Sequence, residues 1–219
     1  MTSPTRRPYT GSCHCGATRY IIFLTLPHTP APVQPGQQRS PNGVQNFYRC
    51  NCTLCHKAGL LHVRPLSPTD DFLLLTPLDP YTEMGDYTVA GLPYPPSHWL
   101  FCKGCGMRCV SVRGAGGVVI LDVDEAGLGP VADRLREAGL VGPEGKVTAW
   151  RPEKPDGDDG AWNGYLSING YSLDAGQEGL DLREWKEKGW VLYLDLLELK
   201  GKGCAAEVQY ERPQDGGAY

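Results

Sequence analysis

The side chains with the most chemical potential in this sequence are thiols. Nine cysteines occur among 219 residues, and seven of them fall into three short clusters along the chain. The first cluster is Cys13 and Cys15, and the third is Cys102 and Cys105. We call these two clusters together the four-cysteine group. The remaining cluster is the three-cysteine group, which consists of Cys50, Cys52 and Cys55. Cysteines separated by one or two residues can turn both sulfurs toward a single ion, and this spacing is typical of zinc sites.

A disulfide framework is not expected for these cysteines. Their number is odd, and no secretory signal precedes them, because the basic segment 1–8 is not followed by an apolar core. No run approaches the roughly 18 consecutive apolar residues of a membrane span. We therefore expect a cytoplasmic protein with no membrane contact, whose thiols stay reduced.

The seven clustered cysteines divide naturally into four ligands and three. The four-cysteine group would complete a tetrahedral structural zinc site that joins distant segments of the chain. The three-cysteine group would bind a second zinc ion through three protein ligands, which leaves one position open to water or substrate. A zinc ion among thiolates favours sulfur, so a thiol is the expected substrate.

Other interpretations of the cysteines stay open. An iron–sulfur cluster is one, although the ferredoxin spacings are absent. A second interpretation is a redox pair of Cys102 and Cys105, although no βαβ context surrounds it. Both sites could also be purely structural, in which case the missing ligand is His14, His56, Cys109 or Cys204. Cys109 lies in an alternating segment and is expected to be a small buried hydrophobe, and Cys204 is expected to take no part.

Composition predicts a mainly β fold. Glycine (28) and proline (19) are frequent, which excludes a helical bundle and indicates many turns between short strands. Hydrophobic residues make up 41% of the chain, enough for a sizeable core. The chain has a formal net charge of −4, whereas general nucleic-acid binders are basic. No nucleic-acid partner is therefore expected.

Local patterns predict short strands and few helices. Strands are expected over the ranges 17–26, 60–64, 72–76, 85–89, 98–102 and 190–199. Residues 108–113 and 117–123 are expected to form a hairpin. Helices are expected over 130–138 and 181–188, from their start and stop residues.

The predicted architecture is a single zinc-held domain of short antiparallel strands. It spans residues 11–200, with a proline-rich loop at 27–46 and an insertion at about 125–163. Residues 1–10 and 201–219 are expected to be terminal tails.

Three motifs together resemble one protein family. They are Gly-Ser-Cys-His-Cys-Gly at 11–16, Cys-Asn-Cys-Thr-Leu-Cys-His-Lys at 50–57 and Phe-Cys-Lys-Gly-Cys-Gly at 101–106. Their order and spacing are similar to those of the glutathione-dependent formaldehyde-activating enzymes, a family that includes relatives of centromere protein V. The resemblance covers residues 11–125 and 164–195. It implies a mainly β fold with structural zinc in the four-cysteine group and catalytic zinc in the three-cysteine group.

The resemblance also implies an activity. The expected enzyme is a carbon–sulfur lyase of the S-hydroxymethylglutathione synthase type, with two zinc ions per chain and glutathione as co-substrate. The loop at 27–46, the insertion at 125–163 and the C-terminal extension are longer than in compact members. Because loops determine substrate choice, a larger adduct of glutathione or another thiol suits the sequence at least as well as formaldehyde.

The expected reaction moves a proton at a carbonyl oxygen. The nearest candidates in the sequence are His56, Lys57 and His62, and Lys57 matches a basic position of the family. Carboxylates of glutathione could be received by Arg49, Arg64 and Lys103.

Two rival functions and one open question of assembly remain. The first rival is a non-enzymatic zinc-binding module that binds another protein, as the centromere-associated relatives suggest. A zinc hydrolase that uses bound water ranks lower, because three thiolates make zinc electron-rich and a poor activator of water. The sequence leaves open whether the protein forms a homodimer.

Overall fold

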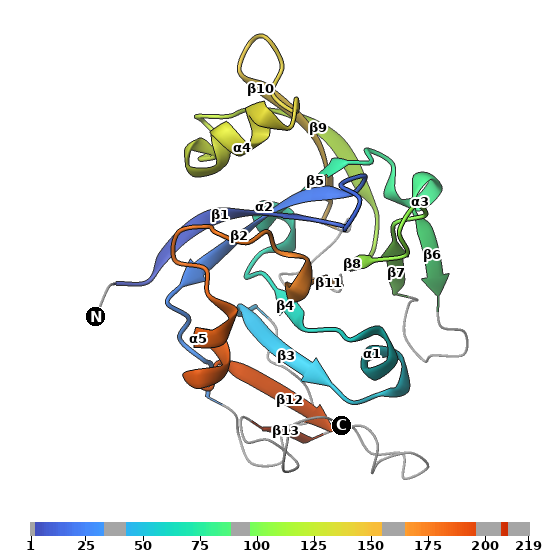
Figure 1. Cartoon of the computed structure of the whole chain (residues 1–219), viewed down its shortest axis with the longest axis vertical. Coiled ribbons are helices and arrows are strands. Elements are labelled where there is room, and N and C mark those ends of the chain that lie inside the picture. Colours follow the sequence, from blue (N-terminus) through green and yellow to red (C-terminus); the bar gives the residue numbers. More distant parts are fainter. Residues whose placement is uncertain (1–2, 33–42, 89–96, 155–164, 196–206, 210–219) are drawn as a thin grey trace.

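The computed structural model describes residues 3–32, 43–88, 97–154, 165–195 and 207–209. Two sheets and a few short helices make up these residues, which confirms the mainly β fold (Figure 1). Cys204 and most of the loop predicted at 27–46 lie outside the described residues.

The first sheet has five strands, all antiparallel. In spatial order they are β1 (Thr5–Ser12), β2 (Arg19–Leu26), β5 (Phe72–Thr76), β10 (Lys146–Pro152) and β9 (Gly116–Asp122).

The second sheet has eight strands, and its only parallel pair is β12 with β3. In spatial order the strands are β13 (Glu207–Gln209), β12 (Val191–Asp195), β3 (Asn46–Cys50), β4 (His62–Arg64), β11 (Tyr165–Asn169), β8 (Arg108–Arg113), β7 (His98–Phe101) and β6 (Gly85–Thr88).

The helices in the described residues are all short. They are α1 (Thr53–Ala58), α2 (Pro68–Asp71), α3 (Pro80–Glu83), α4 (Ala132–Glu137) and α5 (Leu182–Glu187), with 3₁₀ turns at Gly129–Val131 and Gly170–Ser172. The side chain of Asp181 accepts a hydrogen bond from the Arg183 N–H and so begins α5, as the capping pattern predicts.

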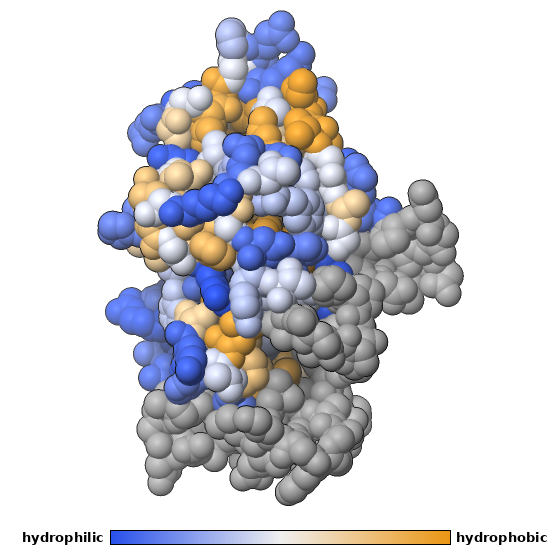
Figure 2. Space-filling view, turned by 90° about the vertical axis from the view of Figure 1, so that its right-hand side faces the viewer, coloured by the Kyte–Doolittle hydropathy of each residue, from blue (hydrophilic) through white to orange (hydrophobic). Residues whose placement is uncertain are grey.

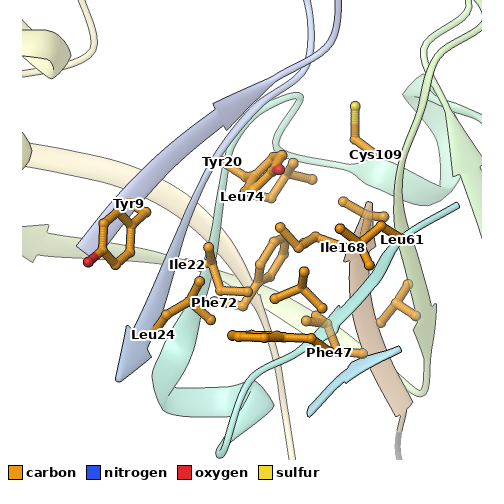
Figure 3. Packing of buried hydrophobic residues seen from close by; sticks show 14 of the residues in the cluster. Tyr9, Tyr20, Ile22, Leu24, Phe47, Leu61, Phe72, Leu74, Cys109 and Ile168 are labelled. Carbon is orange, nitrogen blue, oxygen red and sulfur yellow. The ribbon is translucent and has the colours of Figure 1, made fainter. Parts of the chain in front are cut away.

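The main core lies between the two sheets. Ile22 and Phe72 from the five-stranded sheet meet Phe47 and Ile168 from the eight-stranded sheet (Figure 3). Successive residues of a strand point to opposite faces, so Ile21 and its alternate neighbours enter a second cluster, with α4 and Val147. Because both faces of β2 are buried, its sequence is an almost continuous apolar run.

An aromatic stack attaches α5 to this core. The rings of Phe47 and Trp185 lie 3.9 Å apart with an interplanar angle of 7°, and both side chains are fully buried. Trp185 thereby fixes α5 against β3, the strand that leads into the three-cysteine group.

Two expectations about the sheets are wrong. Residues 1–10 were expected to be a tail, but Thr5–Ser12 form β1 and pair along their whole length with β2. Residues 108–113 and 116–122 do form strands, but not a hairpin, because β8 pairs with β7 and β11 while β9 pairs with β10. The segment expected as an insertion at about 125–163 contains β10, which lies inside the five-stranded sheet between β5 and β9.

The C-terminal prediction also needs correction. Residues 201–219 were expected to be a tail, but the backbone of Glu207–Gln209 pairs with β12 and extends the eight-stranded sheet. The other residues of that range lie outside the described part.

Strand β9 is an edge strand with an apolar outer surface. Val118 is 56% exposed and Ile120 is 68% exposed. Hydrophobic residues are visible at the upper end of Figure 2, the end at which Figure 1 places β9 and β10.

We predict that the stack on Phe47 contributes strongly to stability. Replacing Trp185→Ala should lower the free energy of unfolding by about 3–5 kcal/mol, because it leaves a cavity in a fully buried site. The exposed Ile120→Ala should change it by no more than about 0.5 kcal/mol. Denaturant unfolding followed by circular dichroism measures both. A cost below about 1 kcal/mol for Trp185→Ala would contradict the assigned role.

Candidate metal centres

The structure brings together all four cysteines of the four-cysteine group. Their sulfur atoms all lie within 4.8 Å of one another, so the group could hold a metal ion. The Sγ atoms of Cys15 and Cys102 are 3.5 Å apart, although the two residues are 87 positions apart in the sequence. Cys13 and Cys15 lie in the loop between β1 and β2, whereas Cys102 and Cys105 lie between β7 and β8. The group therefore connects the two sheets.

Two glycines make the loops of this group possible. Gly16 and Gly106 follow the second cysteine of each pair and have φ angles of 76° and 73°. Their N–H groups donate to the carbonyls of Cys13 and Cys102, at 3.0 Å and 2.8 Å. Only glycine adopts this left-handed conformation without strain, so both turns require it.

Backbone hydrogen bonding also prepares the sulfurs for a cation. Burial alone would raise the pKa of Cys13, but the Thr18 N–H, 3.2 Å from its Sγ, and the neighbouring thiols donate hydrogen bonds and lower this pKa to about 6. A thiolate is the form that binds metal. His14 is exposed, and the four sulfurs form a complete set without it.

The three-cysteine group is built by the end of β3 and the start of α1. Cys50 is the last residue of β3, Cys52 is the N-cap of α1, and Cys55 lies in its first turn. The Cys55 N–H donates to the Sγ of Cys52 at 3.4 Å, and the Cys52 N–H donates to the Sγ of Cys50 at 3.4 Å. Gly59, with a φ of 62°, ends the helix. The three sulfurs all lie within 4.8 Å of one another.

The protonation of these three thiols indicates a cation site. The thiols of Cys50 and Cys55 donate hydrogen bonds to the Cys52 thiolate and lower its pKa to about 2. The hydrogen bond to Cys52 raises the pKa of Cys50 to about 12, and hydrogen bonds to Cys50 and Cys52 raise the pKa of Cys55 far above its usual range. Ionisation of one sulfur thus disfavours ionisation of its neighbours. A soft divalent cation would let all three ionise, so the donor set suits zinc.

The group has three protein ligands in the described part of the chain. There, no histidine nitrogen, further thiol or carboxylate lies within 4.8 Å of all three sulfurs. Cys50 and Cys55 are buried, whereas Cys52 is only half-buried. The accessible side of the group is therefore the side of Cys52.

His62 lies directly beside the three-cysteine group. Its Nε2 is 3.2 Å from the Sγ of Cys55, and its Nδ1 is 2.9 Å from the Oγ of Ser167 and 3.3 Å from the hydroxyl of Tyr165. The Tyr165 hydroxyl in turn lies 2.5 Å from that of Tyr48. Burial lowers the pKa of His62 to about 4, so the imidazole is neutral near pH 7.

The other two residues predicted for proton transfer, His56 and Lys57, lie on α1. His56 and Lys57 are exposed, whereas Cys55 points into the protein. One residue along a helix is a rotation of about 100°, so neither side chain follows Cys55 inward. Their roles stay predictions.

The basic residues predicted to receive carboxylates are dispersed. The guanidinium of Arg64 lies 5.1 Å from the centre of the Tyr165 ring, close to the three-cysteine group. Lys103 belongs to the loop of the four-cysteine group, where its ammonium donates to the Thr82 carbonyl at 2.9 Å. Arg49 is half-buried on β3. Sequence reasoning missed Arg113, whose guanidinium lies 5.9 Å from the Tyr165 ring.

Sequence reasoning also missed Tyr48, Trp99, Tyr165 and Ser167. Strand alternation could have identified Tyr48, because it lies two residues before Cys50 and so on the same face of β3. Tyr165 and Ser167 share a face of β11 for the same reason. Their proximity to His62 depends on the pairing of β11 with β4, which no local pattern reveals.

All eight cysteines in the described part are free of disulfide bonds. Cys109 is fully buried in the main core, as predicted for a small hydrophobe. No described helix is both long and apolar enough to cross a membrane.

A cavity of about 270 Å³ lies elsewhere, between β1, β2 and α4. Arg19, Arg134 and Asp174 line it, and no cysteine does. It is therefore separate from both metal centres.

Comparisons of the chain with protein-family models, with curated proteins and with solved structures find no match. The resemblance to the glutathione-dependent formaldehyde-activating family therefore depends on the three cysteine motifs, and it stays a prediction.

We predict that the four-cysteine group needs its metal for folding. Cys102→Ser should lose one metal ion per chain and lower the melting temperature by about 10 °C or more, because a structural site contributes folding energy. Cys109→Ala, a buried cysteine outside both groups, should keep its metal content. Elemental analysis and thermal unfolding measure these effects. A fully metallated Cys102→Ser with unchanged melting would contradict the connecting role.

Proposed function

We propose that this chain is a zinc-dependent carbon–sulfur lyase that forms or cleaves an adduct between a thiol and a carbonyl compound. Glutathione is the thiol that the cysteine motifs favour, and a reducing cytoplasm would supply it. The observation that carries the proposal is the three-cysteine group, with three converging sulfurs and no fourth ligand among the described residues. Three protein ligands with one free position are typical of catalytic zinc, whereas structural sites have four.

Cys50, Cys52 and Cys55 would hold the zinc ion. Zinc bound there would lower the pKa of a thiol at its remaining position, so that the thiol reacts as thiolate. The half-buried Cys52 marks the side from which a substrate reaches the group.

The residues around the group would keep the reacting atoms dry. Tyr48, Leu60 and Leu192 are buried beside the cysteines, and Trp99 and Leu194 pack against the same cluster. Electrostatic interactions are stronger where water is excluded, so this environment would stabilise a substrate thiolate next to a cation.

Arg64 and Arg113 are the residues that would receive a carboxylate of the thiol. Both guanidinium groups lie within 6 Å of the Tyr165 ring, at 5.1 Å and 5.9 Å. The hydroxyl of Tyr165 contacts His62, which contacts Cys55. Two cations near the Tyr165 ring suit an anionic thiol such as glutathione.

Proton transfer to the carbonyl oxygen is assigned to none of these residues. His62 has both ring nitrogens within hydrogen-bond distance of protein atoms, so neither faces a substrate. His56 and Lys57 are exposed on α1 and are the remaining candidates from the sequence.

We predict that the three-cysteine group accepts an external thiol. Protein loaded with cobalt in place of zinc should change its visible spectrum when glutathione is added, because a new thiolate enters the metal's coordination. S-methylglutathione, which lacks the thiol, is the matched ligand and should produce no change. The Cys52→Ser variant should lose the response.

An unchanged spectrum would mean that the position is closed, and would favour the protein-binding module over the enzyme. Repeating the titration with Cys204→Ser then shows whether that cysteine closes the site.

We further predict a loss of turnover when the group is broken. Cys52→Ser should lower the rate of adduct formation or cleavage by at least about 100-fold, because the metal loses one of its ligands. Cys109→Ala is the control and should stay active. Turnover is measured with glutathione and a panel of aldehydes. Full activity of Cys52→Ser would exclude the three-cysteine group as the catalytic centre.

A further inference from the structure

We propose that His62 is a positioning residue of the three-cysteine metal centre, one that donates its Nε2–H to the Cys55 thiolate and fixes that sulfur toward the ion. The inference rests on the metal-binding part of the proposed function and is independent of the reaction. Its basis is the 3.2 Å contact between His62 Nε2 and Cys55 Sγ.

Strand register places the His62 ring. His62 lies on β4 directly opposite Tyr48 on β3 and opposite Asn169 on β11. The Tyr48 ring stacks on the imidazole at 4.5 Å with an interplanar angle of 8°, and the Trp99 ring meets it edge-on at 5.7 Å and 77°. These two ring contacts hold the plane of the imidazole, so its two nitrogens have fixed directions.

The hydrogen bonds give the ring one consistent proton assignment. A cysteine that binds metal is a thiolate, which has no proton and can only accept a hydrogen bond. Nε2 must therefore carry the proton of the neutral imidazole, and Nδ1 must accept. The Ser167 hydroxyl at 2.9 Å and the Tyr165 hydroxyl at 3.3 Å are both able to donate to Nδ1. Both contacts are compatible with the tautomer that supports Cys55.

A hydrogen bond of this kind changes how the sulfur binds metal. Three thiolates around a divalent cation leave a net negative charge, and an N–H directed at one sulfur stabilises that charge. His62 is 2% exposed, so water does not replace the lost donor readily. Removing such a partner typically weakens metal affinity by about 10–100-fold.

The test compares three variants. His62→Phe keeps a planar ring but removes both nitrogens, and it should weaken zinc binding at the three-cysteine group by about 10–100-fold. His62→Gln restores an N–H donor near the Nε2 position and should recover most of the affinity. His28→Phe is the matched control, because His28 is also buried, and burial also lowers its pKa to about 4, but it packs on Phe47 and Trp190.

Two readouts separate positioning from simple destabilisation. Zinc affinity is measured by competition with a chelator, and the four-cysteine group serves as the internal reference for folding. The sulfur-to-metal charge-transfer band of the cobalt protein reports the charge on the sulfurs. This band should shift in His62→Phe and not in His28→Phe.

The proposal is overturned if His62→Phe binds zinc like the unmodified protein and its cobalt band does not move. Should His62→Phe fail to fold, the double variant Ser167→Ala with Tyr165→Phe decides, since it removes the hydroxyls that donate to Nδ1 and keeps the ring. A shifted band there supports the proposal, and an unchanged band overturns it. Zinc affinity and the cobalt band can be measured even if the protein has no lyase activity. Failure of the proposed function can therefore be distinguished from failure of this proposal.

Discussion

The crowding of thiol sulfurs is the constraint on which this structure depends. Seven sulfurs converge in two groups, each with all of its members within 4.8 Å of one another. Thiolates crowded in this way repel one another, and a bound cation would stabilise them. The four-cysteine group lies where a loop of the five-stranded sheet meets a loop of the eight-stranded sheet. A metal ion held there would stabilise the same interface as the core between the sheets.

Strand β3 connects this core to the second centre. Phe47 points into the main core and stacks on Trp185, whereas Tyr48 and Cys50 belong to the cluster around the three cysteines. Neighbouring residues thus serve packing and metal binding on opposite faces of one strand.

The sequence allowed the cysteine groups and most strands to be predicted, because both depend on local spacing. The division into four and three ligands agrees with the two clusters of sulfurs, and the strand expected over 72–76 has the bounds of β5. The pairing of the strands could not be predicted from the sequence. The alternation of polar and apolar residues in Arg108–Arg113 indicates a strand but not the strand with which it pairs. The sequence made His62 a candidate for proton transfer, not a partner of Cys55. Its contact with Cys55 arises from the pairing of β3, β4 and β11 and from the position of α1.

The connection between Cys15 and Cys102 also has a consequence for biosynthesis. At about 5–20 residues per second, the ribosome needs roughly 4–17 s to make the 87 positions that separate them. During that interval the thiols of Cys13 and Cys15 lack the other two cysteines of the group and can react with oxidants or bind other ions. A nascent chain would therefore complete this candidate metal site only after Cys105 has been synthesised.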